Sequence, residues 1–126
     1  MYKIKVFEEQ NILKLGFIKD FTVKDAKQLL EELKVKINNT QKGFTVFSDM
    51  SQLDSMSQEV SSYIVKIMQV CNEKEAAQVV RVIPDPTKEI GFKILSIFHY
   101  SDKVKIFTCN DILEARKFLP NIVFTD

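Results

Sequence analysis

Residues 79–83, Val-Val-Arg-Val-Ile, form a short and almost wholly apolar run that ends at Pro84. A run of this length, rich in β-branched residues, is typical of a strand covered on both faces, as interior strands of parallel sheets are. Parallel strands need a crossover connection, which is usually a helix. The run therefore predicts an α/β fold in which strands and helices alternate along the chain.

The other periodicities supply that alternation. Apolar and polar residues alternate over 2–6 and again over 13–17, which predicts a hairpin, and apolar residues at helical spacing predict a helix over 22–37 capped by Thr22. The elements predicted after them are a strand at 44–47, a helix at 60–72, the strand at 79–83, a helix at 85–98, a strand at 104–108 and a helix at 110–119 capped by Asn110. The order β-β-α-β-α-β-α-β-α predicts a mixed, mostly parallel sheet covered by helices.

The length of 126 residues fits a single domain, with a core over about 1–119 and a C-terminal tail over 120–126 whose apolar residues are compatible with a homodimer. The alternating N-terminus does not resemble a signal peptide, and no apolar stretch is long enough for a transmembrane segment. We therefore expect a cytoplasmic protein. Cys71 and Cys109 lack metal-binding or redox spacing and are expected to be reduced and buried.

Composition argues against several classes of function. The formal net charge is +1 and no basic face is evident, so nucleic acid is not an expected partner. The single histidine, His99, has no evident partners for catalysis, the three glycines form no phosphate-binding loop, and no metal or cofactor site is recognisable. The sequence therefore predicts a protein that is not an enzyme.

The polar stretch 49–59 follows the predicted strand at 44–47, and its residues 49–57 are expected to form a turn that leads into the next helix. Ser55 and Gln58 have the spacing of a capping box at that helix start. Together with the exposed side of helix 60–72, this stretch is the predicted docking surface for a protein partner. Its proposed interaction residues are Asp49, Ser51, Asp54, Ser55, Ser57 and Glu59.

Two short motifs add a family resemblance. Asp49-Met50-Ser51 closes the central strand, and Glu114-Ala115 lies in the helix after the last strand. In these motifs and in the order of its elements the chain resembles the STAS (sulfate transporter and anti-sigma factor antagonist) family, and more narrowly its SpoIIAA-like branch. The resemblance implies a non-enzymatic regulatory domain that binds a protein partner.

The resemblance also bears on phosphorylation. Anti-sigma factor antagonists of that family are phosphorylated within an Asp-Ser-Ser/Thr-Gly turn, and aligning Asp54-Ser55 with it places Met56 at the acceptor position. The usual phosphoacceptor motif is therefore missing, and Ser55 and Ser57 remain the candidate phosphoacceptors.

A second hypothesis rests on ten phenylalanines and four methionines. Between the sheet and the second and third helices, some of these adaptable side chains could line a pocket, which would make the protein a carrier or sensor of a small apolar, lipid-like ligand. Ordinary core packing is the competing interpretation. The candidate pocket residues are Met56, Tyr63, Met68 and Phe92.

Overall fold

A computed structural model describes residues 1–83 and 103–125 of the chain. Its strands are β1 (Tyr2–Phe7), β2 (Ile12–Phe21), β3 (Thr45–Met56), β4 (Gln78–Val82) and β5 (Lys105–Cys109). Its α-helices are α1 (Val23–Lys36), α2 (Ser61–Glu73) and α4 (Ile112–Ala115), and its 3₁₀ turns are η1 (Ile37–Asn39), η2 (Gln58–Val60) and η3 (Asn121–Phe124). The helix predicted at 85–98 and the candidate residues Phe92 and His99 lie outside the described residues.

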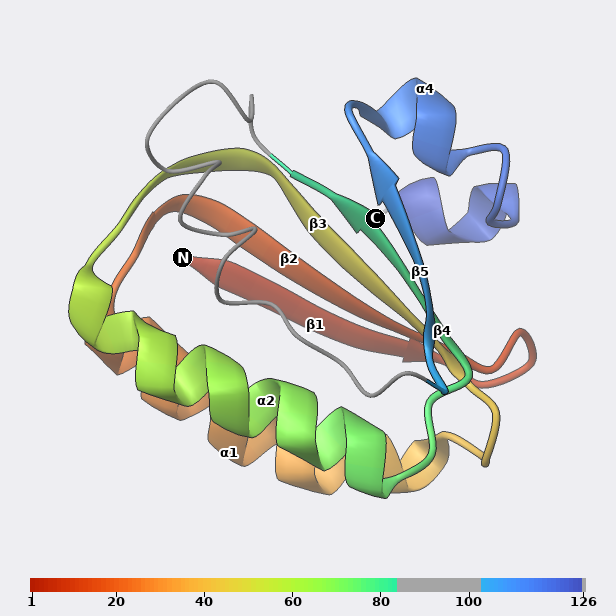
Figure 1. Ribbon diagram of the computed structural model, residues 1–126, viewed down its shortest axis with the longest axis horizontal. Helices are drawn as coiled ribbons and strands as arrows, with labels where there is room; N and C mark the ends of the chain where they lie inside the picture. The colour runs from red at the N-terminus through yellow and green to blue at the C-terminus, as the bar shows by residue number, and fades with distance from the viewer. Residues whose placement is uncertain (84–102, 126) are drawn as a thin grey trace.

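The five strands form one sheet in the order β1-β2-β3-β4-β5. The β1/β2 hairpin is antiparallel and all other pairs are parallel, which confirms the predicted mixed, mostly parallel sheet. Successive right-handed crossovers that advance in one direction along a sheet place their helices on the same face. Accordingly, α1 and α2 lie side by side on one face, whereas α4 and η3 lie on the other (Figure 1).

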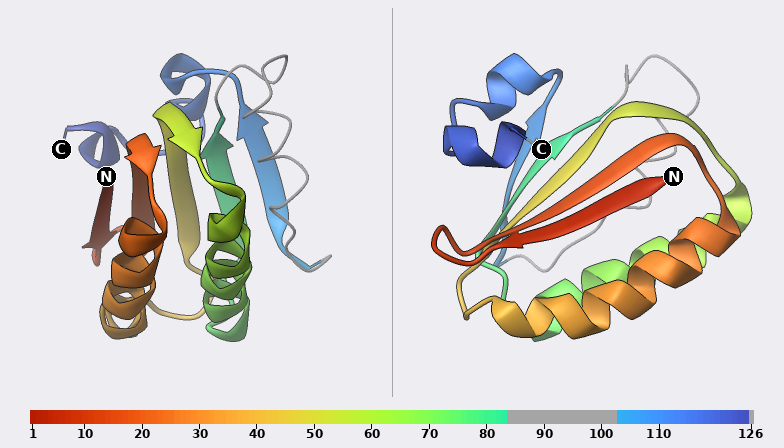
Figure 2. Two further views of the ribbon diagram at one scale, coloured as in Figure 1. Left: turned by 90° about the vertical axis from the view of Figure 1, so that its left-hand side faces the viewer. Right: turned by 180° about the vertical axis from the view of Figure 1, so that it is seen from behind.

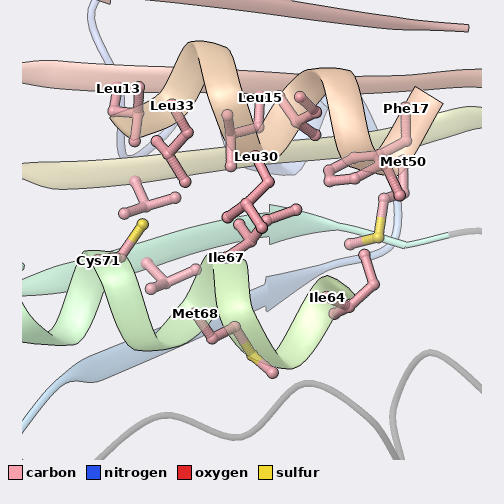
Figure 3. Close-up of a cluster of buried hydrophobic side chains, with 14 of the residues drawn as sticks. Leu13, Leu15, Phe17, Leu30, Leu33, Met50, Ile64, Ile67, Met68 and Cys71 are labelled. Atoms are coloured by element: carbon pink, nitrogen blue, oxygen red, sulfur yellow. The ribbon is translucent and has the colours of Figure 1, made fainter. Parts of the chain in front are cut away.

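The main core lies between the sheet and the pair α1 and α2 (Figure 3). Thr22 and Asp25 form a complete capping box at the start of α1, which confirms the predicted helix start. The apolar stripe of α1 then faces the strands and α2. The buried residues of α1 are Ala26, Leu29, Leu30 and Leu33, and those of α2 are Ile64, Ile67, Met68 and Cys71.

A second, smaller core covers the opposite face of the sheet and includes the C-terminal tail. Val123 is fully buried there, and the ring of Phe124 lies 5.3 Å from that of Phe47 on β3. The core therefore continues past residue 119. The predicted helix at 110–119 is shorter than expected, because Asp111 rather than Asn110 caps it and the helix ends at Ala115.

Candidate functional site

The predicted turn at 49–57 is instead the second half of a long strand. β3 extends to Met56 because β2 is equally extended and stays paired with it, from Ile18 opposite Gln52 to Phe21 opposite Met56. Continued pairing satisfies backbone groups that a turn would leave to water or side chains. The prediction of a turn was therefore wrong, although the polar residues that suggested it are exposed apart from the half-buried Asp49.

Two register irregularities allow this strand to carry so many polar residues. Between the pairs Gly16/Asp49 and Ile18/Gln52, β3 advances by three residues while β2 advances by two, and a further irregularity follows Leu53. These are β-bulges, which loop one residue out of a strand. They allow Met50, Leu53 and Met56, spaced by three, to pack against the same core although the strand period is two. The intervening polar side chains remain outside.

The hydroxyl groups of Ser51 and Ser55 donate hydrogen bonds to carboxylates. Oδ1 of Asp49 accepts hydrogen bonds from the backbone N–H of Ser51 at 3.0 Å and from its hydroxyl at 2.6 Å. The hydroxyl of Ser55 donates to Oδ1 of Asp20 at the end of β2. The capping box predicted for Ser55 is therefore absent, since Ser55 lies within β3 and its side chain points to the neighbouring strand.

The helix start after β3 is η2, for which Ser57 is the N-cap residue without a side-chain hydrogen bond. We call the six predicted interaction residues the β3-end surface. Asp49 is half-buried, and the other five are exposed. The structure thus gathers them along one strand end and the adjoining 3₁₀ turn, and three of the six are carboxylates. The members are Asp49, Ser51, Asp54, Ser55, Ser57 and Glu59.

The residues predicted to line an apolar ligand pocket belong to the main core where they are described. Met68 is buried, and Met56 and Tyr63 pack against the same cluster. Tyr63 also lies under the ammonium group of Lys66, at 5.3 Å from ring centroid to Nζ. These contacts are those of ordinary core packing and do not show a ligand pocket. The apolar-ligand hypothesis therefore stays a prediction. The homodimer also stays a prediction.

A small cleft lies beside Asp49. Lys3, Gly16 and Asp49 are paired in one row across β1, β2 and β3. Gly16 has no side chain, so it forms the floor of a cleft of about 70 Å³ between its two charged neighbours. Lys14 and Gln52 complete the polar part of its lining. Only the register of three strands brings these residues together, and no local sequence motif reveals it.

Neither protein-family models nor curated protein sequences match this chain. Solved structures do. An uncharacterised protein of the DUF3478 family from Shewanella loihica PV-4, described as having a SpoIIAA-like fold, superposes with a TM-score of 0.67 at 16% identity and 94% coverage of both chains. The anti-sigma factor antagonist SpoIIAA in its unphosphorylated form gives 0.65 at 9% identity over 100% of both chains. This chain has a SpoIIAA-like fold.

A third structure, SiaC of Pseudomonas aeruginosa, matches with a TM-score of 0.51 at 8% identity, over 86% of this chain and 91% of SiaC. At identities this low, likeness establishes the shared fold and leaves function to the site. The predicted SpoIIAA-like architecture is therefore confirmed, and the roles of the β3-end surface and of Ser55 and Ser57 stay predictions.

Three further observations concern metal binding, membrane-spanning helices and a buried thiol. Within residues 1–83 and 103–125, no cluster of three or more histidine, cysteine or acidic side chains is arranged to hold a metal ion. Over the same ranges, no helix combines the length and apolar character needed to cross a membrane. Cys71 is buried, and this burial raises the pKa of its thiol to about 12, so the thiol is protonated and unreactive at neutral pH.

Proposed function

We propose that this chain is a non-enzymatic regulatory module that binds a protein partner through the β3-end surface. The observation that supports this proposal is that five of the six residues of this surface are exposed, three of them on strand β3, which is fixed in the sheet, and two at the 3₁₀ turn that follows it. A rigid strand end presents its side chains at lower entropic cost than a mobile loop, which favours recognition. The fold shared with the anti-sigma factor antagonist SpoIIAA supports a regulatory role.

The charge of the surface indicates the chemistry of the partner. Asp49, Asp54 and Glu59 contribute three carboxylates, and Asp20 adds a fourth at the neighbouring strand end. Complementary potentials steer encounter and select among partners. We therefore expect the partner to present a basic surface, and association to weaken as salt concentration rises.

Quantitative affinity capture from native lysate tests the proposal with three versions of the protein. The first is wild type, the second carries Asp54→Arg and Glu59→Arg, and the control carries Glu8→Arg and Glu31→Arg, which make the same charge change at exposed positions elsewhere. A partner retained by wild type and control but lost from the Asp54/Glu59 variant supports the proposal. An identical set of retained proteins in all three samples rules out this surface.

A further inference from the structure

β1 is an edge strand of the sheet, and it lies on the side of α1 (Figure 2). Its antiparallel pairing with β2 includes a hydrogen bond from the N–H of Ile18 to the backbone oxygen of Met1. Along such a pair of strands, residues alternate between those whose backbone bonds to the partner strand and those whose backbone points away from it. The N–H and C=O groups of Tyr2, Ile4 and Val6 therefore face outward at the open edge.

Unpaired backbone groups on an edge strand form a template for pairing with another strand. A cleft of about 430 Å³ borders this part of β1 and is lined by residues 3–5 together with Lys14 and Lys36. Among the described residues, Lys36 alone donates a hydrogen bond to one of the outward groups, since its Nζ lies 3.3 Å from the backbone oxygen of Ile4. The position of Lys36 therefore decides whether another strand can approach the middle of this edge.

Lys36 is held at this position by its own helix and by β1. It is the last residue of α1, and its Nζ lies 3.4 Å from Oε2 of Glu32, one turn earlier. Oε1 of the same carboxylate accepts a hydrogen bond from the hydroxyl of Tyr2 on β1. Glu32 thus compensates the charge of the ammonium group and fixes it beside the strand. α1 is connected to the edge at two points, Tyr2 and the backbone oxygen of Ile4.

The residue pattern of β1 makes a second copy of the chain the strand that fits this edge. Tyr2, Ile4 and Val6 all pack against the main core. Two antiparallel β1 strands centred on Ile4 would therefore continue one apolar face across both sheets. On the opposite face, the same register would place Lys3 opposite Lys5, and like charges in that arrangement are destabilising. Apolar pairing thus favours the association, whereas the lysines of the strand oppose it.

We propose that Lys36 blocks edge-to-edge pairing of two copies of this chain through β1. A second β1 strand needs the outward C=O of Ile4 as a hydrogen-bond acceptor, and Lys36 already occupies that acceptor. Its side chain also lies where the backbone of the second strand would approach. Proteins commonly protect edge strands in this way with charged side chains, lysine above all. The proposal does not depend on the β3-end surface.

Sedimentation velocity over a range of protein concentrations tests the proposal in a background that carries Lys3→Thr and Lys5→Thr, which removes the like-charge repulsion. The test variant adds Lys36→Ala. The control adds Lys34→Ala, which removes an exposed lysine of the same helix whose Nζ lies 3.9 Å from Glu31. The Lys36→Ala protein should self-associate at least about tenfold more strongly than the control, equivalent to about 1.4 kcal/mol. Equal association of the two proteins, or none in the Lys36→Ala protein, overturns the proposal.

Amide hydrogen exchange locates the contact and checks that each variant is folded. The outward N–H groups of Ile4 and Val6 should exchange rapidly in the monomer and become protected as the Lys36→Ala protein associates. Protection confined to residues 120–125 would instead indicate dimerisation through the tail and would refute the proposal. Lys36→Arg retains a charged donor for the Ile4 oxygen and should associate as weakly as the control. Association as strong as that of Lys36→Ala would contradict the blocking role.

Discussion

Replacement of Leu53 by alanine distinguishes a strand from a turn at the β3-end surface. Leu53 is 5% exposed and belongs to the main core, although Asp54 beside it is exposed. Truncating a buried leucine removes its transfer free energy and leaves a cavity, which together cost about 3 kcal/mol. For a domain of this size each kcal/mol lowers Tm by about 4 °C, so Leu53→Ala should lower Tm by about 12 °C.

Urea denaturation followed by circular dichroism measures the effect on the free energy of unfolding. The midpoint should fall while the m-value stays unchanged, since the variant retains the fold and exposes the same surface on unfolding. Asp54→Ala is the matched control and should change stability by no more than about 0.5 kcal/mol, as exposed substitutions usually do. If Leu53→Ala were no more destabilising than Asp54→Ala, residues 49–57 would be an exposed turn and the paired strand would be refuted.

Three further predictions concern the tail, a tyrosine and a buried thiol. Val123→Ala should lower the free energy of unfolding by about 2 kcal/mol, because Val123 is fully buried, whereas Ile122→Ala at a 46% exposed position should change it little; equal effects in urea denaturation would contradict a packed tail. Burial, together with the hydrogen bond to Glu32, raises the pKa of Tyr2 from 10.0 to about 12, so its contribution to stability is complete below pH 10 and is lost as pH rises through about 12. Wild type should therefore lose more stability than Tyr2→Phe between those pH values, and parallel losses would contradict this. Burial also raises the pKa of Cys71 to about 12, so Ellman's reagent at pH 8 should modify it only as the protein unfolds, and rapid modification of native protein would contradict its burial.

The sequence-based predictions agree best with the structure where the apolar spacing and the capping residues of one helix or strand are enough to identify it. The stripe of α1 and the Thr22 cap were predictable because a helix buries residues three and four apart and needs a side chain for its first N–H groups. The apolar run at 79–83 likewise indicated an interior strand, and β4 occupies 78–82. Element order then predicted the sheet, because short connections and right-handed crossovers leave few alternatives.

Prediction failed where the conformation of a segment depends on a neighbouring part of the same chain. Asp49 to Ser57 has the composition of a turn, yet pairing with the long strand β2 keeps it extended and the bulges absorb its irregular apolar spacing. For the tail at 120–126 the sequence left open whether it lies along the domain or reaches a partner, and the face of the sheet left uncovered by α1 and α2 provides an apolar surface for Val123 and Phe124. Neither outcome is encoded within the segment itself.

By itself, the sequence determined the fold class and the position of the polar stretch after the central strand, since both follow from local periodicity and composition. Only the tertiary structure decided which side chains share a face. Strand register places Lys3, Gly16 and Asp49 in one row and Lys5 opposite Lys14, although these residues are distant along the chain. A shift of one residue would send each side chain to the other face, so the clefts beside Asp49 and among the lysines exist only in the assembled sheet.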